Sequence, residues 1–286
     1  MFISRLYQQK NCVFSIEVFP PKKVASEEKL HQTLRSMAEL HPDFISVTYG
    51  AGGSNGGLST CQIAGFIQKQ LQVPALAHLT CVAATPASIA AALDELQEAG
   101  VHNVLALRGD ANPDRPFSKE FPHASDLAEF IQQRGGFCVA GACYPEGHVE
   151  AASLAQDVEN LRHKVAAGVS PLLTQLFFDN IHYYRFLNLA RKKGITAPVS
   201  AGVMPIVNSR QIERTVKLSS ASLPPKFTKM ISRWQDDEQG LFEAGIEYAV
   251  EQLRDLIESG ADGIHLYAMN NPVVAARVHE GIRDLL

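Results

Sequence analysis

Apolar positions along the chain follow two alternating patterns, which are short strand-like runs and longer stretches with helical spacing. The stretch CVFSIEVF at 12–19 shows the first pattern, because it is rich in β-formers and ends at Pro20-Pro21. We expect eight strands of this kind, within 13–19, 44–50, 74–81, 103–110, 137–145, 171–179, 197–205 and 262–270.

Segments with helical spacing lie between these runs. We expect helices within 26–40, 59–71, 85–100, 125–136, 150–168, 181–194, 209–220 and 241–260. Capping residues support these bounds. The predicted N-caps are Ser26, Ser59, Thr85 and Ser209, and the predicted C-terminal stops are Gly100, Gly168, Gly194 and Gly260.

Eight alternating strand–helix units predict the fold class. Units of about 30 residues imply a parallel sheet, and eight of them close an α/β barrel of the (β/α)8 or TIM type. We expect one catalytic domain over 1–286, in which 111–124 forms a polar loop and 219–239 adds a helical turn. A doubly wound open sheet is the alternative, but the sequence shows no nucleotide fingerprint to support it.

Composition narrows the function classes. A net charge of −4 argues against a broad nucleic-acid surface. No apolar run reaches the ~18 residues that cross a membrane, and the N-terminus lacks a signal-peptide pattern. The five cysteines show no paired framework, so we expect reduced thiols in a cytoplasmic protein.

The first strand carries a glutamate among apolar residues. Because side chains alternate across a strand, Phe14, Ile16 and Val18 face one way, whereas Ser15 and Glu17 face the other. A carboxylate in an apolar place is costly unless it is paired or protonated. Two interpretations are open: a structural glutamate paired with an Arg or a hydroxyl, and a general acid that burial keeps neutral.

Polar residues recur where the other predicted strands end. In a (β/α)8 barrel the carboxyl ends of the strands form the active rim. The residues expected there are Glu17, Thr48, Tyr49, His78, Arg108, Gly109, Asp110, Tyr144, Gln175 and Tyr267. A ring of polar side chains from nearly every strand indicates a ligand site.

The segment LRGD at 107–110 is the next candidate. Arg108 offers a planar donor fork for phosphate or carboxylate, and Gly109 lets a ligand approach the backbone. Asp110 could accept hydrogen bonds from ring nitrogens, and the alternative is a local Arg–Asp pair. The glycine-rich stretch 50–57 lacks the lysine of a Walker A loop and the spacing of a dinucleotide loop, which favours a plain βα loop.

A metal site is not predicted. His78, Cys81, Cys143 and His265 could be imagined as a zinc site, but their spacing across the predicted strands matches no zinc signature.

Seven motifs in order carry a family resemblance. They are FSIEVFPPK, ISVTYGAGG, AHLTCVAATP, VLALRGD, YPEGHVEA, LLTQLFFDN and AGVMPI. Together they resemble methylenetetrahydrofolate reductase of the bacterial type, over nearly the whole chain. The resemblance implies a barrel with FAD at its carboxyl rim. It also implies reduction of 5,10-methylenetetrahydrofolate to 5-methyltetrahydrofolate, with NADH or NADPH as the electron donor.

The resemblance also assigns roles to matching positions. Glu17 matches the general acid, and Asp110 matches a catalytic residue near the folate pterin that tunes the flavin. The positions that match flavin contacts are Thr48, Tyr49, Ala51, His78, Arg108, Gly109, Asp110, Ala124, Tyr144, His148, Ala151, Asp157, Asn160 and Lys164. Gln175 and Gln211 match substrate contacts, and a homo-oligomer is expected.

Three positions depart from the family pattern. Asn271 stands where many bacterial members carry an Arg, Thr215 where some carry an aromatic residue, and His163 where an Arg often precedes the lysine. The departures concern the folate and nicotinamide contacts. They leave open whether the donor is NADH, NADPH, ferredoxin or a partner subunit. A non-catalytic barrel is the other alternative.

Overall fold

Eight parallel strands close into a barrel in the computed structural model, which describes residues 1–21, 27–49, 58–110, 116–212, 215 and 221–286. The strands pair in chain order, and β1 closes the ring by pairing with β8. They are β1 (Val13–Val18), β2 (Phe44–Val47), β3 (Ala75–Thr80), β4 (Asn103–Leu107), β5 (Cys138–Cys143), β6 (Leu172–Thr174), β7 (Val199–Val203) and β8 (Gly263–Leu266). The predicted (β/α)8 fold and all eight strands are confirmed.

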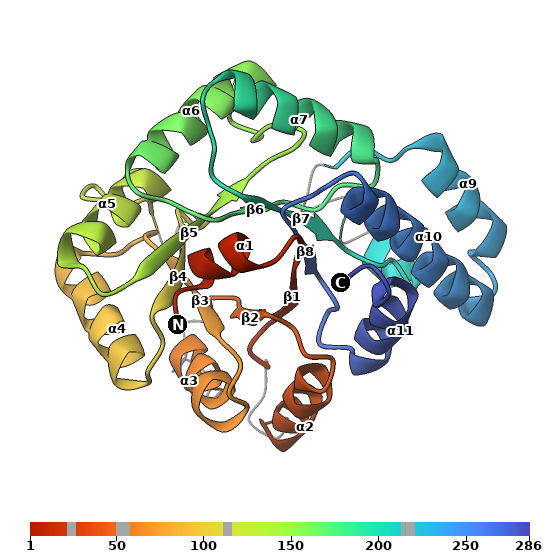
Figure 1. Cartoon of the computed structure of the whole chain (residues 1–286), viewed down its shortest axis with the longest axis horizontal. Helices are drawn as coiled ribbons and strands as arrows, with labels where there is room; N and C mark the ends of the chain where they lie inside the picture. The colour runs from red at the N-terminus through yellow and green to blue at the C-terminus, as the bar shows by residue number, and fades with distance from the viewer. Residues whose placement is uncertain (22–26, 50–57, 111–115, 213–214, 216–220) are drawn as a thin grey trace.

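Helices surround the barrel, as Figure 1 shows, and α1 lies across one end of it. Their bounds are η1 (Ile3–Arg5), α1 (Leu6–Gln9), α2 (Glu27–Ala38), α3 (Thr60–Gln70), α4 (Pro86–Glu98), α5 (Ala124–Arg134), α6 (Leu154–Ala166), α7 (Asn180–Lys192), α9 (Pro225–Trp234), α10 (Glu238–Glu258) and α11 (Pro272–Ile282). Residues 209–212 are also helical.

Local capping explains most of the helix bounds. Ser59 and Thr85 each form a capping box, as predicted. Ser26 lies outside the described residues. The prediction for Ser209 is wrong by one position, because Asn208 Oδ1 accepts a hydrogen bond from the amide of Gln211 at 3.0 Å and Ser209 is already helical. The four predicted stop glycines all have positive φ, a conformation that glycine adopts without a steric cost.

Three parts of the helical layer differ from the prediction. The helix expected from residue 150 begins at Leu154, because Ser153 is its N-cap and accepts from the amide of Gln156. The insertion at 219–239 contains the ten-residue helix α9 rather than a single turn. Helix α11 and the N-terminal turns η1 and α1 were not predicted.

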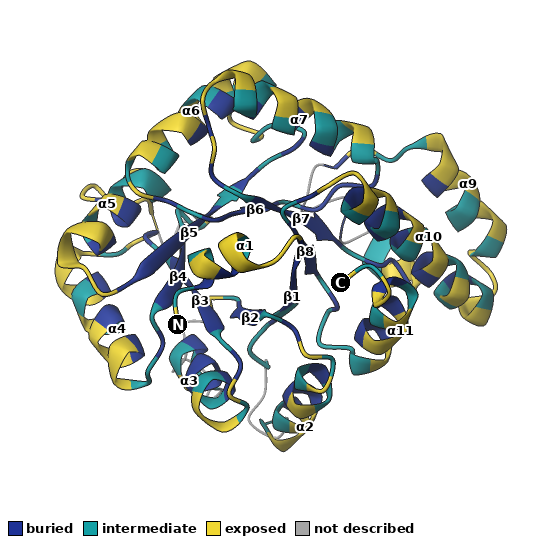
Figure 2. Ribbon diagram, viewed as in Figure 1, coloured by how far each residue is buried: buried dark blue, intermediate teal, exposed yellow. Residues whose placement is uncertain are grey.

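The strands separate two apolar layers. Figure 2 shows the strands as buried and the helices as buried on one face. Phe14, Ile16 and Val18 point outward and pack against helices such as α2, whereas Val13 points inward. Glu17 lies on the inward face and lines the barrel mouth, which is the orientation that strand alternation predicted.

The N-terminal turns close the end of the barrel opposite to the mouth. Ile3 is fully buried, and its amide donates to Oδ1 of Asn103, the first residue of β4, at 2.9 Å. Tyr7 shares a hydrogen bond of 2.7 Å with Ser200 of β7. These contacts join the first turns of the chain to the apolar bottom of the barrel.

We expect Ile3→Ala to lower the free energy of unfolding by about 2–5 kcal/mol, because the bottom of the barrel cannot collapse around the lost volume. Urea unfolding measures the change. Ile181→Ala is the control, because Ile181 is 42% exposed on α7 and its truncation changes stability by less than about 0.5 kcal/mol. Equal losses of unfolding free energy in the two variants would show that Ile3 does not help to close the bottom of the barrel.

Candidate active site

The carboxyl ends of the strands enclose a cavity of about 220 Å³ at the barrel mouth. Its apolar walls come from β4, β5 and β6. Its polar lining comes from Glu17, Thr48, His78, Thr174, Gln175, His265 and Tyr267. The cavity therefore combines apolar walls with polar groups from several strands, which is the usual composition of a small-molecule site.

Glu17 lies between two imidazoles. Its Oε2 is 3.6 Å from Nε2 of His78 and 3.6 Å from Nε2 of His265. The side chain of Glu17 is 20% exposed, so its carboxyl reaches the cavity, while His265 is fully buried. Within the described part of the chain, no Lys or Arg lies within ion-pair distance of Glu17.

The imidazole of His78 is neutral at pH 7. Burial lowers its pKa from 6.5 to about 4, and the carboxyl of Glu17 only partly opposes this shift. Its Nε2 atom is buried and has no hydrogen-bond partner among the described residues, as is also true of Thr80 Oγ1. Orphaned polar atoms of this kind are uncommon in native proteins and are compatible with a ligand contact.

Tyr267 forms one wall of the mouth. Its hydroxyl donates to the carbonyl oxygen of Thr174 at 2.7 Å, which ties β8 to β6 across the intervening strand. The strand between them carries Gly202, where an added Cβ would lie 2.7 Å from the Tyr267 ring. A side chain at position 202 would therefore displace the Tyr267 ring, so the glycine leaves the space that the ring occupies.

A second, larger cavity of about 470 Å³ adjoins the mouth. It is lined by Ala106, Leu107, Arg108, His123, Ala124, Ser125, Ala142, Tyr144, His148, Glu150, Ala151, Asp157, Asn160, His163 and Lys164. Leu107 and Ala142 line both cavities, so the two spaces meet at β4 and β5.

Two cationic side chains, those of Arg108 and Lys164, line the larger cavity. Arg108 pairs with Glu150 at 2.7 Å and lies over the ring of Phe117, with 4.3 Å from Cζ to the ring centroid. Hydrogen bonding to Glu150 raises the pKa of Arg108, and the same bond lowers the pKa of Glu150. Because both partners are partly exposed, this pair is weak enough to exchange for an anionic ligand.

Lys164 reaches the cavity from the inner face of α6. Its Nζ donates to the carbonyl oxygen of Ala142 at 2.8 Å, and burial lowers its pKa. Gly141 leaves room for the lysine stem, since an added Cβ would lie 3.2 Å from Lys164 Cδ and 2.6 Å from Val169 Cγ1. Asp157 lies on the same helix, and burial raises its pKa.

Aromatic and imidazole rings complete this wall. The rings of Tyr144 and His148 meet edge to face, with centroids 4.8 Å apart. Burial raises the pKa of Tyr144 to about 12, so its hydroxyl keeps its proton and can donate to a ligand.

The structure gathers most of the predicted site residues around these two cavities. Eight line the larger one: Arg108, Ala124, Tyr144, His148, Ala151, Asp157, Asn160 and Lys164. Four line the mouth: Glu17, Thr48, His78 and Gln175. Gln175 Oε1 accepts from the amide of Leu176 at 2.9 Å, which leaves its amide group as the part that can donate to a ligand.

Four of the predicted residues that the structure describes line neither of these two cavities. Tyr49 and Asp110 are exposed, and Gly109 adopts a positive φ of 82° beside Val82. Gln211 uses Oε1 to accept from the amide of Val207 at 2.8 Å. Ala51 lies outside the described residues. The roles assigned to all of the predicted site residues, inside and outside the two linings, stay predictions.

Several lining residues were not assigned to the site from the sequence. His265 was weighed only as a metal ligand and Tyr267 only as a rim residue, whereas His123, Ser125 and Glu150 were not considered. The alternation in HLY at 265–267 is the signal that places both rings on the inward face.

Two further sequence features have local explanations. Asn271 caps α11, because its Oδ1 accepts from the amides of Val273 and Val274 at 3.0 and 3.3 Å. The four side chains weighed as a zinc site divide between two layers: Cys81 and Cys143 pack in the outer layer, whereas His78 and His265 line the mouth. Across the described ranges, no three His, Cys, Asp or Glu side chains gather in a metal-binding cluster.

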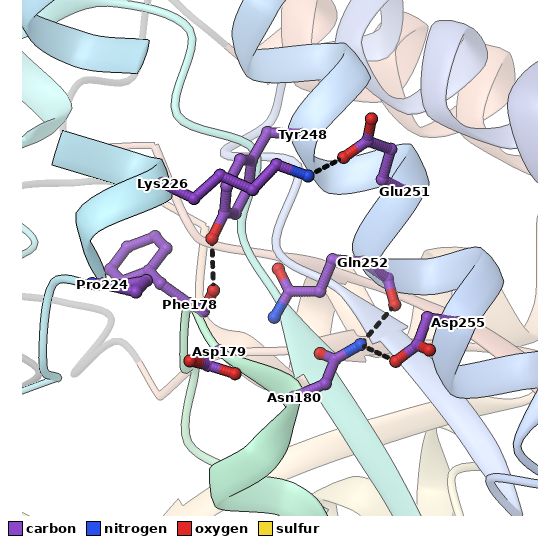
Figure 3. A pocket seen from close by; sticks show the side chains of 9 residues that line it. All are labelled: Phe178, Asp179, Asn180, Pro224, Lys226, Tyr248, Glu251, Gln252 and Asp255. Carbon is purple, nitrogen blue, oxygen red and sulfur yellow. Dashed lines mark hydrogen bonds and ion pairs between the residues drawn. The ribbon is translucent and has the colours of Figure 1, made fainter. Parts of the chain in front are cut away.

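A third cavity, of about 260 Å³, lies outside the barrel mouth between α7, α9 and α10 (Figure 3). Its polar groups largely satisfy one another. Tyr248 donates to the Phe178 carbonyl oxygen at 2.6 Å, Lys226 pairs with Glu251, and Asn180 Nδ2 donates to Asp255 at 2.7 Å. The exception is Oδ1 of Asn180, which is buried and has no hydrogen-bond partner among the described residues.

No helix in the described residues has both the length and the apolar character needed to cross a bilayer.

The fold and the two joined cavities define a (β/α)8 barrel with a ligand site at the carboxyl rim of its strands. The family model of methylenetetrahydrofolate reductase matches residues 2–282. The chain belongs to the methylenetetrahydrofolate reductase family, as its motifs indicated.

Curated relatives agree with this assignment. The chain is 34% identical to methylenetetrahydrofolate reductase 1 of Schizosaccharomyces pombe, over 92% of this chain and 44% of that protein. It is 33% identical to methylenetetrahydrofolate reductase (NADH) 1 of Arabidopsis thaliana, over 94% and 48%. It is 31% identical to the 5,10-methylenetetrahydrofolate reductase of Escherichia coli, over 90% and 86%. The chain thus spans less than half the length of the yeast and plant relatives and most of the bacterial one.

A solved structure shares the fold at low sequence identity. It is an uncharacterised protein from Clostridium thermocellum that binds two copies of 5-methyl-5,6,7,8-tetrahydrofolic acid. The match has a TM-score of 0.66 at 13% identity and covers 99% of this chain and 98% of that one.

We expect the low pKa of His78 to make the fold sensitive to acid. Between pH 6.5 and about 4 the imidazole of His78 binds a proton in the unfolded chain but stays neutral in the folded protein. The free energy of unfolding therefore falls as the pH drops through this window. His78→Gln should remove up to about 3 kcal/mol of this loss. Urea unfolding at pH 7 and pH 4.5 measures the change in the free energy of unfolding between the two pH values. His163→Gln, on the exposed face of α6, is the control. An unchanged pH slope in His78→Gln would show that the imidazole is not the group responsible.

Proposed function

We propose that the protein reduces 5,10-methylenetetrahydrofolate to 5-methyltetrahydrofolate at the barrel mouth, with FAD as the cofactor and NADH or NADPH as the electron donor. The observation that carries the proposal is the placement of Glu17. Its carboxyl lies in the mouth of the barrel, and no described Lys or Arg lies within ion-pair distance of it. The adjoining larger cavity is lined by the cationic side chains of Arg108 and Lys164. Family membership makes folate reduction the reaction that fits this arrangement.

The residues of the larger cavity fit a flavin dinucleotide. Arg108, Lys164 and His148 can hold an anionic diphosphate, and Asn160 and Asp157 can hydrogen-bond to hydroxyl groups. At the mouth, Leu105, Leu107, Ala142 and Leu173 offer apolar contact for a ring, and the orphaned Nε2 of His78 can bind a polar ring edge. FAD bound here would supply the hydride chemistry that no amino-acid side chain provides.

Glu17 supplies the proton that the folate needs. The five-membered ring of methylenetetrahydrofolate opens when its N10 gains a proton and the bond from the methylene carbon to N10 breaks, which leaves an N5 iminium on the substrate. In this step the O–H bond of Glu17 breaks, an N–H bond forms at N10, and Glu17 becomes a carboxylate. A carboxyl beside which the described residues place no Lys or Arg is suited to this role, because no fixed cation there opposes its binding of a proton.

The comparisons also bear on the substrate and the electron donor. The plant relative is named for NADH, which favours that donor, and the Clostridium protein of the same fold binds a methylated tetrahydrofolate. Gln175 and Gln211 are proposed as folate contacts, and Asp110 as the carboxylate near the pterin. A single domain, a homo-oligomer and a cytoplasmic location complete the proposal.

We expect the purified protein to carry flavin. Lys164→Met should weaken flavin binding roughly 10-fold to 100-fold, because the variant loses a charged hydrogen-bond donor but keeps an unbranched side chain of similar length. Flavin absorbance after gel filtration and titration of the apoprotein measure the change. Lys192→Met, on the exposed face of α7, is the matched control. A protein that takes up no flavin would contradict the proposed cofactor, and full binding by Lys164→Met would contradict the role of this lysine.

We expect Glu17→Gln to separate the two half-reactions. The amide is similar in size but cannot donate a proton as an acid, so folate reduction should fall about 10²- to 10⁴-fold while flavin reduction by NADH or NADPH stays within a few-fold. Stopped-flow absorbance of the flavin follows each half-reaction.

Glu98→Gln, on the exposed face of α4, is the control for the Glu17 experiment. Equal losses in the two half-reactions of Glu17→Gln would refute its role as the general acid.

A further inference from the structure

The third cavity, of about 260 Å³ between α7, α9 and α10, has a polar lining that the proposed reaction does not use. Its inner wall is deeply buried, since Phe178 is 4% exposed and Gln252 is 7% exposed. Its outer edge carries the exposed side chains of Lys226, Glu251 and Asp255. A ligand can therefore enter this cavity from the protein surface without passing the barrel mouth.

Two amide side chains of the lining have engaged their NH₂ groups but not their oxygens. Asn180 Nδ2 donates to the carbonyl oxygen of Gln252 at 2.9 Å and to Oδ2 of Asp255 at 2.7 Å. Gln252 Nε2 donates to the carbonyl oxygen of Phe177 at 2.9 Å. Neither amide can be turned over, because its oxygen would then face an acceptor.

The two amide oxygens are therefore left without donors. Asn180 Oδ1 is buried and has no partner among the described residues, and Gln252 Oε1 makes no hydrogen bond with any of them. In Figure 3 the Gln252 side chain extends from α10 toward Phe178 and Asp179. Unpaired acceptors in a deeply buried wall are uncommon, and they call for a ligand that donates.

The charge of the lining favours the same kind of ligand. The charged residues are Asp179, Glu251, Asp255 and Lys226, so carboxylates outnumber cations by three to one. The Tyr248 hydroxyl donates to the carbonyl oxygen of Phe178 at 2.6 Å. Burial raises the pKa of Tyr248 to about 12, and the carboxylates of Asp179 and Glu251 add to this shift. The cavity thus combines free acceptors with a negative electrostatic potential.

Lys226 shows which chemical group this cavity accepts. Its ammonium pairs with the carboxylate of Glu251 and lies 5.6 Å from the centroid of the Tyr248 ring. A carboxylate and an aromatic face together are a favourable setting for an organic cation. The Lys226 side chain is 70% exposed, so its ammonium can leave this position at little cost.

An amine fits the lining better than a metal ion does. In the part of the chain that the structure describes, no three His, Cys, Asp or Glu side chains gather closely enough to hold a metal. Phe178, Pro224 and Tyr248 give the cavity apolar surface, which suits a carbon chain.

We propose that this cavity binds a small aliphatic diamine. One ammonium group replaces that of Lys226 beside Glu251 and Tyr248, and the other donates to the unpaired Oε1 of Gln252. The described lining of this cavity shares no residue with the two cavities at the carboxyl rim, so the inference does not depend on the proposed function.

Calorimetric titration of the purified protein with cadaverine tests the site. Pentanediol and glutarate have the same five-carbon chain with neutral and anionic ends. Cadaverine should bind and raise the melting temperature, whereas pentanediol and glutarate should do neither. Absence of cadaverine binding would overturn the proposal, as would equal binding of the diol.

Two variants should change cadaverine binding in opposite directions. Glu251→Gln removes a charged acceptor and should weaken binding about 3-fold to 10-fold. Lys226→Met removes the internal ammonium that competes for Glu251 and should tighten binding by about the same factor. Their matched controls are Glu247→Gln and Lys229→Met, which are exposed on the same two helices and lie outside the lining.

All four of these side chains are exposed, so the variants should fold. If each variant and its control shifted the affinity equally, net charge rather than this cavity would explain the binding, and the proposal would fail. A lysine blocked at both its amino and carboxyl ends tests whether the cavity instead receives a side chain of another protein. Tighter binding of blocked lysine than of cadaverine would overturn the proposal, as would binding of magnesium or calcium ions in place of the diamine.

Discussion

A carboxyl inside a ring of strands must be paired with a cation or carry its own proton, because burial makes an isolated charge costly. The neighbours of Glu17 follow from this constraint. His78 and His265 flank the carboxyl, Ser15 and Ser46 orient the buried ring, and the described residues place no Lys or Arg against it. The strand interiors near the mouth thus hold polar side chains where an inert barrel would hold branched apolar ones.

Stability and chemistry occupy opposite ends of the barrel. At the bottom, Val13, Leu76 and Cys138 pack inward and the N-terminal turns close the opening. Around the outside, an apolar layer packs the strands against the helices, and Figure 2 shows that the strands and one face of the helices are buried. Because these two regions supply the packing, the mouth can retain buried polar atoms without partners, such as Nε2 of His78 and Oγ1 of Thr80.

The sequence was informative where a single strand or helix end carries the signal. The period-2 pattern located every strand and put Glu17 on the inward face, and Ser59 and Thr85 marked their helices through contacts three residues away. The sequence was uninformative where a contact joins two residues that are far apart along the chain. Glu150 was read as the start of a helix, but Ser153 is the cap, and Glu150 instead meets Arg108, which is 42 positions away. His265 looks like an ordinary core residue until the register of β1 and β8 brings Ser15 beside it.

Strand β5 shows how the two cavities come to adjoin. Its sequence CVAGAC places two small residues, Gly141 and Ala142, side by side, and each has a separate reason to be small. Ala142 points inward between the cavities, where a larger side chain would fill the passage, and its carbonyl oxygen holds the ammonium of Lys164. Gly141 points outward, where the lysine stem and Val169 leave no space for a Cβ. Lys164 can therefore reach from α6 to the carbonyl oxygen of Ala142 because β5 has little side-chain volume on both faces, so the same strand accommodates the lysine and separates the two cavities.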